Sequence, residues 1–226
     1  MLGYNQAEIE VELESVVTSA IERCIKFRFG GSGGTVEPYE KSVVMSFTNG
    51  LGVANMNEIP AGVVWTCINA KDEKHTLRRN LALDTEGGKY VASFTDDDKL
   101  IGGDLTNDNK IDILDFGAFV GQWGWSLGAP NCEWSGRHGD ISGNGTVGVE
   151  DFSFIQIHFL TLGELLCGKA ASVSSVGADD PRTSVSVRDL AKVIGVRDAM
   201  NADLNRDGMV DMTDVRLFVR KFLTRR

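Results

Sequence analysis

The sequence lacks the residue arrangements on which most enzymes depend. It has only three histidines, His75, His138 and His158, which lie far apart in the chain and in none of the common metal or triad spacings. No Gly-x-Ser-x-Gly elbow, phosphate loop or dinucleotide fingerprint occurs. A carboxylate pair acting on sugars is the remaining catalytic alternative. We predict that the chain is not an enzyme.

Positive charge and long apolar runs are also scarce. The chain has 23 Lys and Arg residues against 32 Asp and Glu residues, a formal net charge of −9. Nucleic-acid binding favours a basic face, so we expect no nucleic-acid partner. No apolar run is long enough to span a bilayer, so we expect no membrane span.

Cysteine is limited to four residues, none in a Cys-x-x-Cys or Cys/His zinc pattern. An even number allows two disulfides with three possible connectivities. Sequence distance favours Cys24–Cys67 and Cys132–Cys167, because each pair then stays within one half of the chain. Four buried free thiols are the alternative.

The first hundred residues read as a series of short strands. Residues 7–14 and 21–29 alternate apolar and charged side chains, which is typical of half-buried strands. Residues 41–48 and 51–56 flank Asn49-Gly50, a strong hairpin signal. Further strands are expected at 63–69, 89–94 and around 76–83. We predict a mainly β, Ig-like sandwich for residues 1–100.

The first predicted strand has two possible locations. It begins at Ala7 and ends at Glu14, with Ile9, Val11 and Leu13 on one face and four glutamates on the other. It can complete its own sandwich, or it can be donated to the sheet of a neighbouring copy. Head-to-tail donation does not close on itself and builds a filament.

Three twelve-residue segments share one ligand pattern: loop one (104–115), loop two (140–151) and loop three (203–214). Oxygen-bearing side chains stand at positions 1, 3 and 5, a backbone carbonyl is available at 7, and a carboxylate stands at 12. This pattern is typical of a calcium loop. Position 6 needs a residue that tolerates positive φ, and it holds Asn109, Gly145 and Gly208. We therefore predict Ca²⁺ as the bound ion.

The predicted ligands follow from those positions. Loop three has the strongest set: Asp203, Asn205, Asp207, Met209 by its carbonyl, Asp211 through water, and Asp214. Loop one is nearly as good: Asp104, Thr106, Asp108, Lys110 by its carbonyl, Asp112 and Asp115. Loop two is weaker, because only two of its ligands are anionic: Asp140, Ser142, Asn144, Thr146 by its carbonyl, and Asp151.

An apolar stripe at helical spacing follows each loop, for example Phe116, Phe119, Val120 and Trp123 after loop one. We thus expect residues 101–226 to form an α-helical, EF-hand-like calcium-loop domain. The apolar residues at position 8 should point inward and pair adjacent loops: Ile111, Val147 and Val210.

These features resemble the dockerin type I repeat, a calcium loop followed by one helix. Gly103-Asp104 and the Asp-x-Asn-x-Asp-Gly pattern of residues 203–208 carry the resemblance, which covers roughly 104–224. It implies calcium binding and docking onto cohesin modules of bacterial extracellular scaffolds. The chain departs from the two-repeat pattern, because it has three loops that start at 104, 140 and 203.

The arrangement of a β-domain before dockerin-like repeats also resembles secreted proteins of planctomycete-type bacteria. Residues 67–72, 75–79 and 137–140 carry that likeness. Weak calcium loops fill only at millimolar calcium, so we predict an extracellular or cell-surface location. The leading hypothesis is a calcium-stabilised structural protein that self-assembles, with a pilus-like fibre as one form. The alternative is an adaptor that binds a cohesin-like domain or a glycan.

Overall fold

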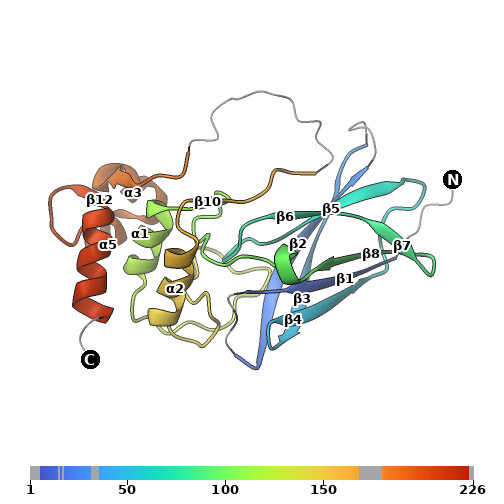
Figure 1. Ribbon diagram of the computed structural model, residues 1–226, viewed down its shortest axis with the longest axis horizontal. Helices are drawn as coiled ribbons and strands as arrows, with labels where there is room; N and C mark the ends of the chain where they lie inside the picture. Colours follow the sequence, from blue (N-terminus) through green and yellow to red (C-terminus); the bar gives the residue numbers. More distant parts are fainter. Residues whose placement is uncertain (1–5, 15, 17, 32–35, 168–179, 224–226) are drawn as a thin grey trace.

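The computed structural model describes residues 6–14, 16, 18–31, 36–167 and 180–223. An eight-stranded sheet occupies one end of the molecule and a group of short helices occupies the other (Figure 1). In the described part of the chain, no helix is both long and apolar enough to cross a membrane.

The sheet has the strand order β6-β5-β2-β3-β4-β1-β8-β7. Every pair is antiparallel except β1 with β8, which is parallel. Its strands are β1 (Ala7–Glu12), β2 (Ala20–Gly31), β3 (Tyr39–Thr48), β4 (Leu51–Met56), β5 (Trp65–Asp72), β6 (Arg79–Ala82), β7 (Asp84–Glu86) and β8 (Lys89–Phe94).

The sheet divides at the turn between β3 and β4. Asn49 and Gly50 both have positive φ, as the predicted hairpin requires. Only Thr48 and Leu51 pair across the turn; β3 then continues along β2, and β4 continues along β1. We call β6-β5-β2-β3 the β2 half-sheet and β4-β1-β8-β7 the β1 half-sheet.

Both half-sheets contribute to one buried apolar cluster. Alternating residues supply it, such as Ile9 and Val11 of β1 and Phe27 and Phe29 of β2, all fully buried. This period of two follows from the pleat, which sends successive side chains to opposite faces. The alternation that predicted these strands is therefore the pattern that builds the core.

Strand β1 lies in the middle of its half-sheet, between β4 and β8. It pairs with β4 from Ala7 to Glu12 and with β8 from Ala7 to Val11. Ile9 and Val11 are fully buried, whereas the three glutamates that alternate with them in β1 are partly exposed. In this structure the strand thus completes the sheet of its own chain.

A second apolar cluster lies among the helices: α1 (Ile113–Gly121), α2 (Val149–Ile157), α3 (Val187–Ile194), α4 (Val196–Ala202) and α5 (Met212–Phe218). Phe116, Phe119, Phe152 and Phe218 form its aromatic centre, with ring centroids 5.2–6.2 Å apart. The aromatic stripes expected from the sequence therefore form core.

A helix follows each loop, as predicted, but the loops do not pair with one another as expected. In loop one, β9 (Lys110–Ile111) pairs with β10 (Thr161–Leu162). In loop three, β12 (Met209–Asp211) pairs with β11 (Ser184–Ser186). Thr146 of loop two forms an isolated bridge with Ser126. The unequal spacing of the loops leaves intervening chain that supplies each partner strand instead.

Both predicted disulfide pairings are wrong, although both disulfides form. Cys24 bonds to Cys132 and Cys67 to Cys167, so each bond crosses between the two halves of the chain. The register explains this: Cys67 lies opposite Gly30 of β2, six residues from Cys24. That offset is about 20 Å along the strand, far beyond the reach of a disulfide.

Candidate calcium-binding loops

Loop three curls around the carboxylates at its first and last positions. Asp214 is fully buried, and Asp203 is nearly so. Asp203 accepts backbone N–H groups from Asp207 at 3.1 Å and from Gly208 at 2.9 Å. Asp214 accepts one from Leu204 at 2.7 Å. These bonds hold both carboxylates on the inside of the turn.

Loop one repeats the arrangement. Asp104 and Asp115 are both fully buried. Asp104 accepts the backbone N–H of Asp108 at 3.2 Å and of Asn109 at 2.9 Å. Asp115 accepts that of Leu105 at 2.9 Å. The left-handed φ of Asn109 allows the chain to turn back at position 6, as predicted.

Loop two has the same geometry with fewer charges. Asp140 and Asp151 are buried, and Asp140 accepts backbone N–H groups from Asn144 and Gly145. Asp151 accepts that of Ser142 at 2.7 Å. The first and twelfth positions therefore carry equivalent buried carboxylates in all three loops.

The side chains at positions 3 and 5 form hydrogen bonds within their own loop. The side-chain oxygen at position 5 accepts the backbone N–H of position 7 in every loop, from Lys110 to Asp108, Thr146 to Asn144, and Met209 to Asp207. Position 3 contacts another ligand position in each case: Thr106 donates to Asp115, Ser142 to Asp140, and Asn205 to Asp207. Hydrogen bonds within each loop thus orient the side chains at positions 3 and 5.

Position 9 has a further role in two loops. Asp112 caps α1 by accepting the backbone N–H of Leu114 at 2.7 Å, and Asp211 caps α5 by accepting that of Thr213 at 2.6 Å. In both cases the position-12 carboxylate completes a capping box. The same aspartates therefore end the loop and begin the helix.

In loops one and two, three of the buried carboxylates lie in an unfavourable electrostatic environment. Burial, with Asp104 nearby, raises the pKa of Asp115 well above its usual range. Burial also raises the pKa of Asp104 and Asp151. A divalent cation held between the first and twelfth positions would offset this repulsion.

The predicted ligands of the three loops are all oxygen donors. Among the residues that the structure describes, no three His, Cys, Asp or Glu side chains are grouped as a metal site. The predicted ligands of each loop combine two buried carboxylates with hydroxyl, amide or carbonyl oxygens. Calcium accepts such mixed oxygen ligands readily.

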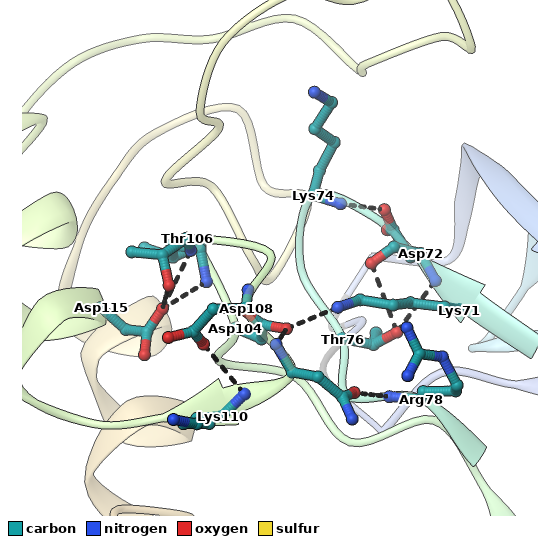
Figure 2. Close-up of polar contacts among 12 residues, drawn as sticks. Lys71, Asp72, Lys74, Thr76, Arg78, Asp104, Thr106, Asp108, Lys110 and Asp115 are labelled. Atoms are coloured by element: carbon teal, nitrogen blue, oxygen red, sulfur yellow. Dashed lines mark hydrogen bonds and ion pairs between the residues drawn. The ribbon is translucent and has the colours of Figure 1, made fainter. Parts of the chain in front are cut away.

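Loop one also contacts a lysine that the sequence did not suggest. Lys71 of β5 is buried, and its Nζ lies 2.7 Å from Oδ2 of Asp104 (Figure 2). The same oxygen accepts the N–H of Asn109, whereas Oδ1 accepts that of Asp108. The ammonium group therefore supports the carboxylate from the sheet side.

Loop two is joined to the sheet by a buried arginine. Arg23 of β2 is 1% exposed, and its Nη2 donates to the carbonyls of Asp140 and Ile141, both at 3.1 Å. Its Nε lies 3.8 Å from Asp72. Although burial opposes it, His75 and Arg23 lower the pKa of Asp72 to about 2. The carboxylate is thus the counter-ion of this buried arginine.

Two of the dispersed histidines meet beside Arg23. His75 Nδ1 donates to Asp72 at 2.7 Å, and His138 Nε2 donates to the carbonyl of Gly128 at 2.7 Å. The rings approach to 3.0 Å between His75 Nε2 and His138 Nδ1. Burial, together with Arg23, lowers the pKa of His75 to about 4. Both rings therefore lie at the junction, by which we mean the contact between the sheet and the calcium loops.

Sequence reasoning missed these junction residues because their contacts span long distances in the chain. Arg23 occupies an inward position of β2, on the same face as Ile25 and Phe27, and residues 68–72 of β5 are buried on both faces. A charged residue on the apolar face of β2 was the available signal for Arg23, although it did not identify the partner. Comparison of the chain with protein families, with curated proteins and with solved structures finds no match.

Proposed function

We propose that the chain is a non-enzymatic, extracellular structural protein that calcium stabilises. The observation that carries this proposal is the pair of buried carboxylates at positions 1 and 12 of each loop, held by backbone N–H groups. An ion there would stabilise the start of a helix whose aromatic residues fill the second core. Calcium would then act as a permanent structural component.

The two disulfides support an extracellular location, because such bonds persist in oxidising compartments. They connect the sheet to the segments before and after loop two. Together with Arg23 and Lys71, they resist separation of the two ends of the molecule. Such cross-linking suits a building block that bears load better than a sensor that must change shape.

The direct test is calcium binding and its effect on stability. Isothermal titration calorimetry should show calcium binding, and calcium should raise the melting temperature relative to EGTA. Replacing Asp115 and Asp214 by Ala should remove two of the binding events. Glu86→Ala, an exposed acidic residue in β7, is the matched control. Equal melting temperatures in calcium and EGTA would refute the proposal.

We further propose that copies assemble by exchange of β1, with a pilus-like fibre as the expected product. Two features support this: the apolar side chains of β1 are buried, and β1 pairs on both edges with strands of its half-sheet. A copy whose own β1 is withdrawn would expose a groove between β4 and β8. The β1 of the next copy would fit it with the same register.

Electron microscopy of the full chain and of a chain lacking residues 1–14 tests this assembly. The full chain should form filaments in calcium, and the truncated chain should not. A synthetic peptide of residues 6–14 should bind the truncated chain. Such binding would show that the truncated chain has an open groove between β4 and β8 and has not simply unfolded. Identical particles from both chains would contradict strand exchange.

The second candidate is an adaptor that holds a cohesin-like domain or a glycan while the calcium loops stabilise it. A polar pocket on the outer face of the β2 half-sheet favours the glycan form. A glycan-array screen of the calcium-loaded protein, with the truncated chain as comparison, would distinguish an adaptor from a purely structural subunit.

A further inference from the structure

A cavity of about 230 Å³ lies on the outer face of the β2 half-sheet. Its lining includes Lys26, Arg28, Glu40, Asn69, Glu73 and Arg78. The register explains why they converge: Arg28 of β2 lies directly opposite Glu40 of β3 on one side and Asn69 of β5 on the other. Cross-strand neighbours share one face of a sheet. None of the predicted calcium ligands is among these residues.

Two buried hydrogen-bond donors in this lining have no partner among the described residues. They are Nε of Arg28 and Nδ2 of Asn69, whose side chain is 2% exposed. The orientation of the Asn69 amide is fixed, because its Oδ1 accepts the backbone N–H of Cys167 at 3.1 Å. An unsatisfied buried donor costs free energy. Both donors therefore favour a ligand that supplies acceptor oxygens.

The charge balance favours an anionic ligand. Lys71 also borders the cavity, but Asp104 neutralises it. The remaining lining holds three cations, Lys26, Arg28 and Arg78, against two carboxylates, Glu40 and Glu73. Glu40 pairs with both Lys26 and Arg28, and Glu73 pairs with Lys26, so Arg78 is the lining cation without an ion pair among the described residues. Burial and the nearby Arg28 lower its pKa, although Asp104, Glu73 and Glu40 oppose this. A carboxylate would compensate its positive charge.

The wall of the cavity is held in place before any ligand arrives. Leu166 forms part of it, and the Cys67–Cys167 disulfide attaches this segment to β5. Asn80 donates its side-chain amide to the carbonyl of Leu165 at 2.6 Å. A preformed site loses less conformational entropy on binding.

We propose that this cavity binds a compact sugar acid. Arg28 and Arg78 would receive its carboxylate, since a guanidinium group presents a planar fork of donors that matches a carboxylate. Asn69 would donate to a ring or hydroxyl oxygen, and Glu40 and Glu73 would accept from hydroxyl groups. The volume is below the range of about 300–1,000 Å³ typical of drug-sized ligands, which favours a single sugar ring.

Calorimetric titration of the intact chain with glucuronate, glucose and acetate tests the proposal, at one saturating calcium concentration throughout. Arg78→Gln removes the carboxylate partner. Asn69→Asp keeps the acceptor for Cys167 but replaces the unpartnered donor with a negative charge. Lys89→Gln removes the same charge from the β1 half-sheet, where Lys89 pairs with Glu8, and is the matched control.

Glucuronate should bind saturably and more tightly than glucose or acetate. Arg78→Gln and Asn69→Asp should each weaken it by about tenfold or more, as expected for loss of a charge-assisted hydrogen bond. Lys89→Gln should leave it unchanged. No saturable binding, acetate binding as tightly as glucuronate, or equal effects of all three variants would overturn the proposal. Melting temperatures identify a variant that has unfolded. If Asn69→Asp unfolds the protein, Arg78→Gln still tests the proposal, because Arg78 is only half-buried.

Discussion

Replacing Lys71 with Met should destabilise the protein strongly in EGTA and much less in calcium. The Lys71 side chain is 6% exposed, Asp104 is fully buried, and their charged atoms lie 2.7 Å apart. Removing one partner of a buried ion pair costs about 3–5 kcal/mol, because the other charge stays buried without compensation. In EGTA, Asp104 and Asp115 would repel each other with no cation nearby.

Calcium should supply the missing charge. With the ion bound, the loss should fall to about 1 kcal/mol, the value of one hydrogen bond. The difference, about 2 kcal/mol or more, must appear as tighter calcium binding to the variant. It corresponds to about a 30-fold gain in affinity at loop one. Urea unfolding followed by tryptophan fluorescence measures the first quantity, and calorimetry measures the second.

Lys26→Met is the matched control, because Lys26 lies opposite Lys71 in the register of β2 and β5. Its side chain is 36% exposed and pairs with Glu40 and Glu73 at the surface. Such pairs contribute at most about 1 kcal/mol. Equal losses for Lys71→Met in calcium and EGTA, or a loss no larger than that of Lys26→Met, would refute the reasoning.

Three further predictions concern the cores and the cross-links. Phe218→Ala should cost about 3–5 kcal/mol in urea unfolding, because the ring is fully buried among five aromatic residues. Reducing either disulfide should cost about 4–5 kcal/mol, since the loops they close span 108 and 100 residues; unchanged unfolding in dithiothreitol would contradict this. Asp72 should contribute about 2 kcal/mol that is present above pH 4 and lost as the pH falls toward 2, because its folded pKa is about 2 against an ordinary 3.8. Asp72→Asn should flatten that part of the stability profile, and an unchanged slope would assign the loss to other groups.

Local patterns predicted the elements of this fold well. Period-two alternation located β1 and β2, Asn49-Gly50 located the turn after β3, and the helical stripes located α1, α2 and α5. These features depend on residues close together in sequence. The hydrogen bonds between predicted ligands are equally local, since each lies within one twelve-residue loop.

Long-range neighbours could not be predicted in the same way. The disulfide partners depend on the offset between β2 and β5, which neither strand encodes alone. The contact of His75 with His138 spans 63 residues, and that of Lys71 with Asp104 spans 33. Both depend on how the sheet packs against the loops. The junction that connects the predicted domains was therefore visible only in three dimensions.

That junction makes the three loops unequal. Loop one is supported by Lys71, and loop two by Arg23. Loop three follows α4, and none of its hydrogen bonds found in the described residues reaches the sheet. Without calcium, its buried Asp203 and Asp214 would have only local partners. Chelation should therefore unfold the region around loop three first.

Hydrogen exchange followed by mass spectrometry can measure this order. In EGTA, peptides from 196–218 should lose protection before peptides from α1 and before those from β2 and β5. The reason is that two loops keep a protein cation nearby: Lys71 contacts the position-1 carboxylate of loop one, and Arg23 contacts the carbonyls of positions 1 and 2 of loop two. Loop three depends on the ion for that charge. Arg23→Met should bring the exchange of loop two close to that of loop three. If all three loops lost protection together in the unaltered chain, the sheet would not be supporting the first two, and calcium alone would hold each loop.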